Sequence, residues 1–241
     1  IRTPPQPTDW ASDEDVDETM PEISIPSPPE RDTGVRVTAT TLVNEVAEHS
    51  GDGHTYAAGE ESPGLSPTTF GTVVHRLNEL RPPRDEWDSF VERVSQMAGE
   101  EPTTDDIHAA IDHADDAIRF VDDFEASITL EAVHDEYSVM ARLDGSRIVG
   151  DIDRLLVTPD RYHIIDYKTN DLSATTSRNL ARHYRPQMLS YVLALFQHDP
   201  TRHVRASLRF TDAGVEERFE WESDELEDVK SELREMVDLI E

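Results

Sequence analysis

The spacing of apolar residues predicts a series of helices in the first half of the chain. Ser66-Pro67 is a favourable helix start, because serine caps free backbone N–H groups and proline fits the first helical position. Apolar side chains recur at helical spacing after it and in two further stretches, 84–98 and 103–126. Upstream, the expected elements are a short strand or extended lead-in at 35–40, a short helix at 41–48 and a Gly-rich loop at 49–65.

The pattern changes to strand-like alternation at Ser127. A helix that opens at Pro186 and ends near Gln197 follows the first group of strands. The expected strands are 127–134, 136–143, 146–157, 161–168, 203–210 and 214–221, and the last helix covers 224–240. This order predicts an α/β (α+β) fold in which helices flank a mixed central sheet, with an N-terminal helical elaboration.

Residues 1–34 differ in composition from the rest of the chain. They hold seven of the fifteen prolines and nine acidic residues against two arginines, which is typical of a flexible, disordered acidic linker. The folded domain would then cover residues 35–241. The chain begins at Ile1 and not at Met, which indicates a fragment of a longer protein.

The charge of the chain is strongly negative, and its cations are almost all arginine. The formal net charge is −30, and only Lys168 and Lys230 are lysines. This balance is typical of proteins from salt-loving archaea, because molar salt shortens the Debye length to about 3 Å and screens surface repulsion. An acidic, partly disordered protein is the alternative, but periodic apolar segments run through most of the chain.

Composition also excludes several classes of protein. The chain has no cysteine, so it has no disulfide, no thiolate zinc site and no cysteine-ligated iron–sulfur cluster. No signal peptide is recognisable, and no apolar run approaches the roughly 20 residues of a membrane helix. We therefore expect a cytoplasmic protein without a membrane partner. A phosphate-binding P-loop is also missing, so this chain should not hydrolyse ATP.

The negative charge is not evenly distributed along the chain. An acidic protein repels the phosphates of nucleic acids, but residues 142–209 contain eleven basic residues, seven aspartates and no glutamate. Their net charge of +4 inside an acidic chain suggests a surface that faces a polyanion. The alternative is ordinary fluctuation in composition.

The most informative pattern is a hairpin with acidic residues on both arms. Residues 158–161 form a good two-residue turn with proline at its second position. If the ends of this turn pair, Asp153 falls opposite Asp166, and Asp151 falls opposite Lys168 on the same face. Directly opposed carboxylates destabilise a sheet, unless a divalent cation reverses the sign of their interaction. The alternative is that these acids are solvated on an open face.

Lys168 strengthens the case for chemistry at this hairpin. One of only two lysines lies two residues after Asp166, on the same face of the strand. Because arginine serves almost everywhere else, lysine here suggests a chemical requirement. Its compact ammonium has a pKa that moves with its surroundings. It could orient or deprotonate an attacking water and stabilise a charged phosphate.

Four segments, in order, resemble the motifs of one nuclease superfamily. Residues 150–154 (GDIDR) and 166–169 (DYKT) resemble motifs II and III of the PD-(D/E)xK nucleases. Residues 187–191 (QMLSY) resemble the QxxxY motif of the RecB-like branch, and residues 71–77 (GTVVHRL) resemble its upstream helix with a histidine. The resemblance spans roughly residues 35–241 and is closest to the nuclease domains of the RecB and AddA helicase–nucleases.

This resemblance implies a restriction-endonuclease-like core and a deoxyribonuclease, with an exonuclease as the expected type, that depends on Mg²⁺ or Mn²⁺. Asp153 and Asp166 would ligate the metal, and the Tyr167 carbonyl would be a further ligand. His75 would add a ligand or a phosphate contact, and Lys168 would act on the attacking water. Several RecB-like nucleases carry an iron–sulfur cluster on four cysteines. This chain has none, which favours the RecB or AddA side over AddB-type and CRISPR-associated exonucleases.

Other residues would order the site or hold DNA. Gln187 and Tyr191 share one helix face, and Glu131 resembles an acid that some relatives carry on the strand before the hairpin. Three arginines could track a phosphate backbone if their helix is continuous through Pro186. These are Arg178, Arg182 and Arg185, and ion pairs with the many acids of this protein are the alternative for them.

The sequence thus predicts a nuclease domain for single-stranded DNA or duplex ends, with a helicase motor N-terminal in the same chain, in DNA end processing and recombinational repair. One alternative is a non-catalytic DNA-binding or docking module of a helicase, against which the intact Asp153, Asp166 and Lys168 argue. Another is an acidic protein that mimics DNA, which the basic segment 142–209 does not fit.

Overall fold

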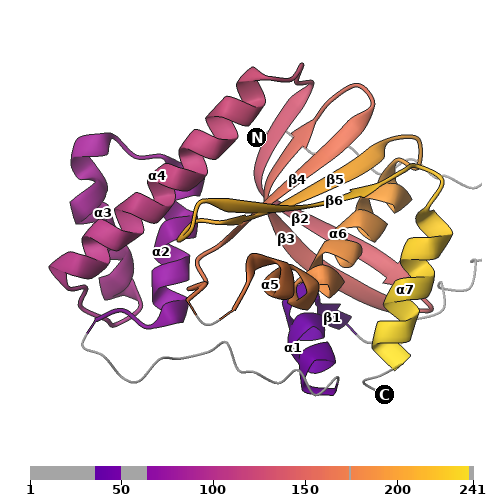
Figure 1. Ribbon diagram of the computed structural model, residues 1–241, viewed down its shortest axis with the longest axis horizontal. Coiled ribbons are helices and arrows are strands. Elements are labelled where there is room, and N and C mark those ends of the chain that lie inside the picture. The colour runs from indigo at the N-terminus through magenta and orange to yellow at the C-terminus, as the bar shows by residue number, and fades with distance from the viewer. Residues whose placement is uncertain (1–35, 50–63, 174, 239–241) are drawn as a thin grey trace, which may run out of the picture. The chain divides into compact units, whose positions relative to one another are not determined.

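A mixed sheet of six strands organises the described part of the chain (Figure 1). The computed structural model describes residues 36–49, 64–173 and 175–238, all within the compact unit of residues 33–241. The strands lie in the order β1-β3-β4-β5-β6, and β2 pairs with β3. Their bounds are β1 Arg36–Thr38, β2 Ala132–Leu143, β3 Ser146–Val157, β4 Arg161–Lys168, β5 His203–Phe210 and β6 Val215–Trp221.

The long strand β3 creates an opening in the sheet. One edge of β3 pairs with β2 from Ser146 to Val157, except at Asp153. The other edge pairs in parallel with β1 as far as Val149, and antiparallel with β4 only from Arg154 onward. Residues 150–153 therefore have no strand partner on this edge in the described sheet. Backbone and side chains at such an opening are free to face a cleft.

Helices cover both faces of the sheet. Figure 1 shows the long helix α4 on one face and α6 with α7 on the other. α4 packs on β3 and β4, and α6, α1 and α7 contribute to the largest apolar core. The helices are α1 Ala39–His49, α2 Pro67–Leu80, the 3-10 turn η1 Arg84–Glu86, α3 Trp87–Met97, α4 Thr104–Ala126, α5 Ser177–His183, α6 Arg185–His198 and α7 Leu226–Asp238.

The helical elaboration before the sheet forms as the sequence predicts. Ser66 caps α2 by accepting a hydrogen bond from the N–H of Thr69, and Pro67 occupies the first turn. Thr103 and Asp106 form a reciprocal capping box at the start of α4. α2, α3 and α4 then share an apolar cluster that includes Leu77. The predicted α/β fold, a mixed sheet flanked by helices, is confirmed.

The expected strand at 127–134 is confirmed only for residues 132–134. Residues 127–131 connect α4 to the sheet, and a single strand, β2, runs from Ala132 to Leu143. The cause is the hairpin turn at Asp144-Gly145, where φ is 46° and 86°. A two-residue turn of this kind fixes the register, and β3 then pairs with this one strand at every position except Asp153.

A short helix, α5, was not predicted. Its signal is Thr176, whose hydroxyl caps α5 by accepting from the N–H of Asn179. The predicted linker at 1–34 and most of the predicted loop at 49–65 lie outside the described residues. Within the described ranges, no helix combines the length and apolar character that crossing a membrane requires.

Candidate active site

The β3–β4 hairpin brings the two aspartates to the opening in the sheet. The predicted register is confirmed, with paired positions from Arg154–Ile165 to Val157–Tyr162. The pairing ends there, so Asp153 and Asp166 are not a paired position. Instead, Asp153 Oδ2 accepts a hydrogen bond of 2.7 Å from the N–H of Tyr167.

The expected pairing of Asp151 with Lys168 does not form. Asp151 pairs with Ser138 of β2, and Lys168 pairs with Phe210 of β5. The two strands have separated here, and each continues with another neighbour. The alternative of acids on an open, solvated face is also wrong, because the side chains of Asp153 and Asp166 are only 11% and 2% exposed.

Helix α2 places His75 against both strands. Its Nδ1 lies 3.2 Å from Asp153 Oδ1, and its Nε2 lies 3.1 Å from the carbonyl oxygen of Tyr167. His75 is therefore not a solvated surface histidine. The structure brings together all four groups that the resemblance implies as metal ligands, namely Asp153, Asp166, the Tyr167 carbonyl and His75.

Glu136 of β2 is an acid at this site that the sequence analysis missed. One carboxylate oxygen of Glu136, one of Asp153 and one ring nitrogen of His75 lie within 4.8 Å of one another. Glu136 has a left-handed φ of 48°, which is uncommon for a residue other than glycine and is often found at functional sites. Backbone conformation was the missing signal, and alternation of residue types does not reveal it.

Glu131 lies apart from this group, so the expectation that it belongs to the site is wrong. Its carboxylate pairs with Arg202 at 3.0 Å, and its N–H donates to the carbonyl of Val157 at the far end of β3. The acid of the strand before the hairpin that reaches the site is Glu136, five residues later. The sequence analysis placed a strand at 127–134, which put Glu131 in the wrong structural context.

Lys168 is held by three partners at the end of β4. Its Nζ lies 2.6 Å from Asp166 Oδ2 and donates to Gln187 Oε1 at 3.0 Å. The ammonium also lies over the ring of Tyr184, 4.1 Å from the centroid, in a cation–π arrangement. Tyr184 was missed from the sequence, because it falls in the break between α5 and α6 that only the fold reveals.

Gln187 and Tyr191 connect Lys168 to the glycine-containing segment of β3. Gln187 Nε2 donates to the Tyr191 hydroxyl at 2.8 Å, and this hydroxyl donates to the carbonyl of Asp151 at 2.7 Å. A Cβ at Gly150 would lie 2.7 Å from the Tyr191 ring. Glycine is therefore required at 150 for the tyrosine to reach the unpaired edge of β3. Both residues are buried, so they order the site from within α6.

Burial and charge shift the proton affinities of the cluster. Burial lowers the pKa of His75, but the charge of Asp153 and the contact with it outweigh burial and raise that pKa to about 9. Burial raises the pKa of Asp166 to about 6, with Lys168 opposing the shift and Asp153 reinforcing it. Burial, and then Asp153, also raise the pKa of Glu136. The carboxylate of Asp153 thus repels those of Asp166 and Glu136.

The donor set fits a divalent cation. Oxygen ligands from Asp153, Asp166 and Glu136 suit Mg²⁺ and Mn²⁺, and the imidazole of His75 is a nitrogen ligand that Mn²⁺ accepts more readily than Mg²⁺. His75 must lose its proton to bind an ion. The groups line a cavity of about 720 Å³, together with Lys168 and Gln187. A cation here would relieve the repulsion among the carboxylates.

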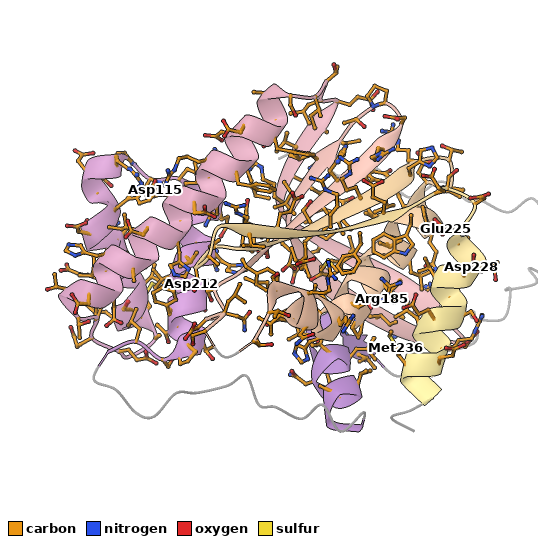
Figure 2. The ribbon with its side chains drawn as sticks, viewed as in Figure 1. Asp115, Arg185, Asp212, Glu225, Asp228 and Met236 are labelled. Carbon is orange, nitrogen blue, oxygen red and sulfur yellow. The ribbon has the colours of Figure 1, made fainter. Side chains whose placement is uncertain are left out.

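The three candidate arginines do not form one surface. α5 ends at His183 and α6 begins at Arg185, so the helix is not continuous. Arg185 donates to Glu232 of α7 at 2.8 Å and lies toward α7 in Figure 2. Arg178 and Arg182 are exposed on α5. They make no ion pair with any residue that the structure describes.

Comparison with known proteins gives weak structural likenesses. No curated protein matches the chain. A candidate exonuclease from Eubacterium rectale is 11% identical with a TM-score of 0.46, covering 87% of this chain and 82% of that chain. The solved structure of SSO0001 is 13% identical with a TM-score of 0.31, covering 82% and 83%. Neither likeness is close enough to bear on function.

The match to a family is more extensive. The model of the PD-(D/E)XK nuclease superfamily matches residues 52–241. This range contains His75, both aspartates, Lys168 and the Gln187–Tyr191 pair, and it covers most of the chain. The chain belongs to the PD-(D/E)XK nuclease superfamily.

Proposed function

We propose that this chain is a metal-dependent DNA nuclease domain that hydrolyses phosphodiester bonds. The observation that carries the proposal is the convergence of Asp153, Asp166, Lys168 and His75 on one cleft from three different elements. A structural role alone does not account for this arrangement. The largely buried Asp153 and Asp166 share the cleft with Glu136, and these three carboxylates outnumber the two cationic side chains, His75 and Lys168.

The residues have separate roles in this proposal. Asp153, Asp166, Glu136, His75 and the Tyr167 carbonyl hold Mg²⁺ or Mn²⁺. The ion supplies Lewis-acid stabilisation of the charge that develops on the phosphate.

Lys168 orients the attacking water and donates to a phosphate oxygen. Gln187 and Tyr184 hold its ammonium in place for this task.

The finer assignment follows the sequence motifs. We infer a RecB- or AddA-like nuclease domain, with a helicase motor N-terminal in the same protein, that degrades single-stranded DNA or duplex ends as an exonuclease in end processing and recombinational repair. Arg178 and Arg182 contact the DNA backbone.

The acidity and the scarcity of lysine support an origin in a salt-loving organism, and we infer a cytoplasmic location. The linked side chains of Gln187 and Tyr191 support the RecB-like branch.

A cleavage assay on end-labelled DNA at molar KCl tests the proposal. The wild-type chain should cut with Mg²⁺ or Mn²⁺ and should not cut in chelator. A non-catalytic docking module would bind DNA under the same conditions and leave it intact. Asp123 is exposed on α4 and makes no ion pair with any described residue, so Asp123→Asn is a matched control for substitutions of the cleft aspartates.

A further inference from the structure

Two cavities meet at the proposed metal cluster. The first, of about 720 Å³, extends from the cluster along β1, β2 and β3. The second, of about 540 Å³, extends from the cluster between α1 and α2. Both are lined by His75, Glu136, Lys168 and Gln187. The cluster thus lies at the junction of one cleft with two arms, which we name the strand arm and the helix arm.

The helix arm differs in charge from the surface around it. Apart from the shared residues, its walls contain hydroxyl and amide side chains such as Asn44, Thr68 and Thr72, and no carboxylate among the described residues. The chain has 52 acidic residues in 241, so a wall without carboxylates is unusual here. Such a wall does not repel a phosphate backbone.

The strand arm carries one available cation. Arg36 and Thr38 of β1 line this arm at alternate positions of the strand. The other cations of the cleft are engaged, because Lys168 pairs with Asp166 and Arg76 with Glu79. Arg36 is exposed and makes no ion pair within the described ranges. Asp151 lines the same arm, but its carboxylate accepts a hydrogen bond from Ser138.

We propose that one DNA strand lies along both arms, so that nucleotides are held on each side of the bond that is cut, and that Arg36 binds a phosphate in the strand arm. This inference rests on the proposed nuclease function and specifies how the substrate is bound. Because both arms contribute binding, the first products are oligonucleotides, and release of single nucleotides from an end is disfavoured.

The test compares Arg36→Gln with Arg93→Gln. Arg93 is also exposed and has no ion pair within the part of the chain that the structure describes, but it lies on α3, outside the cleft. Arg36→Gln should lower kcat/KM on a labelled 20-nucleotide single strand about tenfold, mainly through KM, as expected for loss of a phosphate contact. The slope of log affinity against log salt should change by about 0.7. Calorimetric Mn²⁺ affinity should be unchanged. Arg93→Gln should match the wild type in all three measurements.

The outcomes separate this inference from the proposed function. If the wild type cuts DNA but Arg36→Gln behaves like Arg93→Gln, the strand path is wrong and the nuclease assignment stands. First products that are single nucleotides, from substrates labelled at either end, would also overturn the path. If the wild type binds the 20-nucleotide strand but never cuts it, the nuclease function fails. In that case, weaker DNA binding by Arg36→Gln than by Arg93→Gln supports the strand path, and equal binding overturns it.

Discussion

Asp153 and Arg154 are neighbours on β3, yet they belong to two different charged clusters on opposite faces of the sheet. Arg154 donates to Glu125 of α4 at 2.7 Å and also pairs with Asp135 of β2. Asp153 faces the cleft, with His75 and Asp166. Both clusters bury charge, and each combines more carboxylates than cations.

The difference lies in the kind of cation. The guanidinium of Arg154 cannot be deprotonated in a protein and reaches both carboxylates at once. Burial would lower the pKa of Arg154, but Glu125 and Asp135 outweigh it and raise that pKa further. In the cleft the cations are His75 and Lys168, which can change protonation or partner. A permanent cation suits a structural cluster, and exchangeable cations suit a cluster that binds a metal.

The largest expected effect tests the cleft side of this contrast. Asp166→Asn should reduce cleavage about 10³-fold or more, since it weakens the site that holds the metal. The fold should persist, because two effects of the substitution offset each other. It removes the repulsion with Asp153, which is stabilising, and it removes the ion pair with Lys168, which is destabilising. Gel cleavage with Mn²⁺ and circular dichroism measure the two quantities. Metal-dependent cleavage at the level of the Asp123→Asn control would exclude Asp166 from the site.

The next effect tests the structural side. Arg154→Met should lower the free energy of unfolding by about 2–4 kcal/mol, because two carboxylates would lose their shared partner. The value is below that of a fully buried pair, since Glu125 and Asp135 are 22% and 35% exposed and reach water. Denaturant unfolding at molar KCl measures it, with Arg182→Met as the exposed control. Equal stability of the two variants would show that the cluster is not structural.

A lysine substitution sharpens the contrast between the two kinds of cation. Lys168→Arg should reduce cleavage about 10²-fold, because the planar guanidinium does not fit the position between Asp166, Gln187 and the Tyr184 ring. Mn²⁺ affinity should be kept. Lys230→Arg is the matched control, since Lys230 pairs with Glu227 on α7, outside the cleft. If Lys168→Arg cuts DNA like Lys230→Arg, the lysine is not required for the chemistry.

The smallest effect concerns His163, which lies on the same face of the sheet as Arg154. Burial and then the nearby Arg205 and Arg161 lower the pKa of His163 to about 4. The folded state therefore resists a proton that the unfolded chain binds below pH 6.5. Stability should be full above pH 6.5 and should fall by about 1–3 kcal/mol as the pH drops toward 4.

His163→Gln isolates this contribution. The difference in unfolding free energy between the wild type and His163→Gln should decline from pH 7 to pH 4, and it should be constant above pH 7. Other groups also titrate in this range, so only the difference between the two proteins is informative. A difference that is independent of pH would mean that His163 has the same pKa in the folded and unfolded states.

The sequence predicted the elements that depend on short local signals, such as helix caps and tight turns. Ser66-Pro67 fixed the start of α2, and the turn at 158–161 gave the register that puts Asp153 and Asp166 on one face. The lysine at 168 pointed to chemistry because arginine is used almost everywhere else. In each case a few neighbouring residues carry the information.

The remaining features depend on contacts between distant segments. Glu136 reaches the site through an unusual backbone conformation, and Tyr184 meets Lys168 only because α5 and α6 break at that residue. The assumption of continued pairing beyond Arg154 was wrong, because β3 and β4 pair only between Arg154–Ile165 and Val157–Tyr162, although β4 continues beside β5 as far as Lys168. Alternation and helical spacing carry no information about where two strands separate.

Binding of Mn²⁺ to the isolated chain tests the central claim, that the cleft cluster around Asp153 is a metal site. Calorimetric titration at molar KCl and pH 8 should give saturable binding for the wild type and for Asp123→Asn. The same titration of Asp153→Asn should show binding that is lost or weakened at least about tenfold. Equal Mn²⁺ affinity in all three proteins would contradict the account.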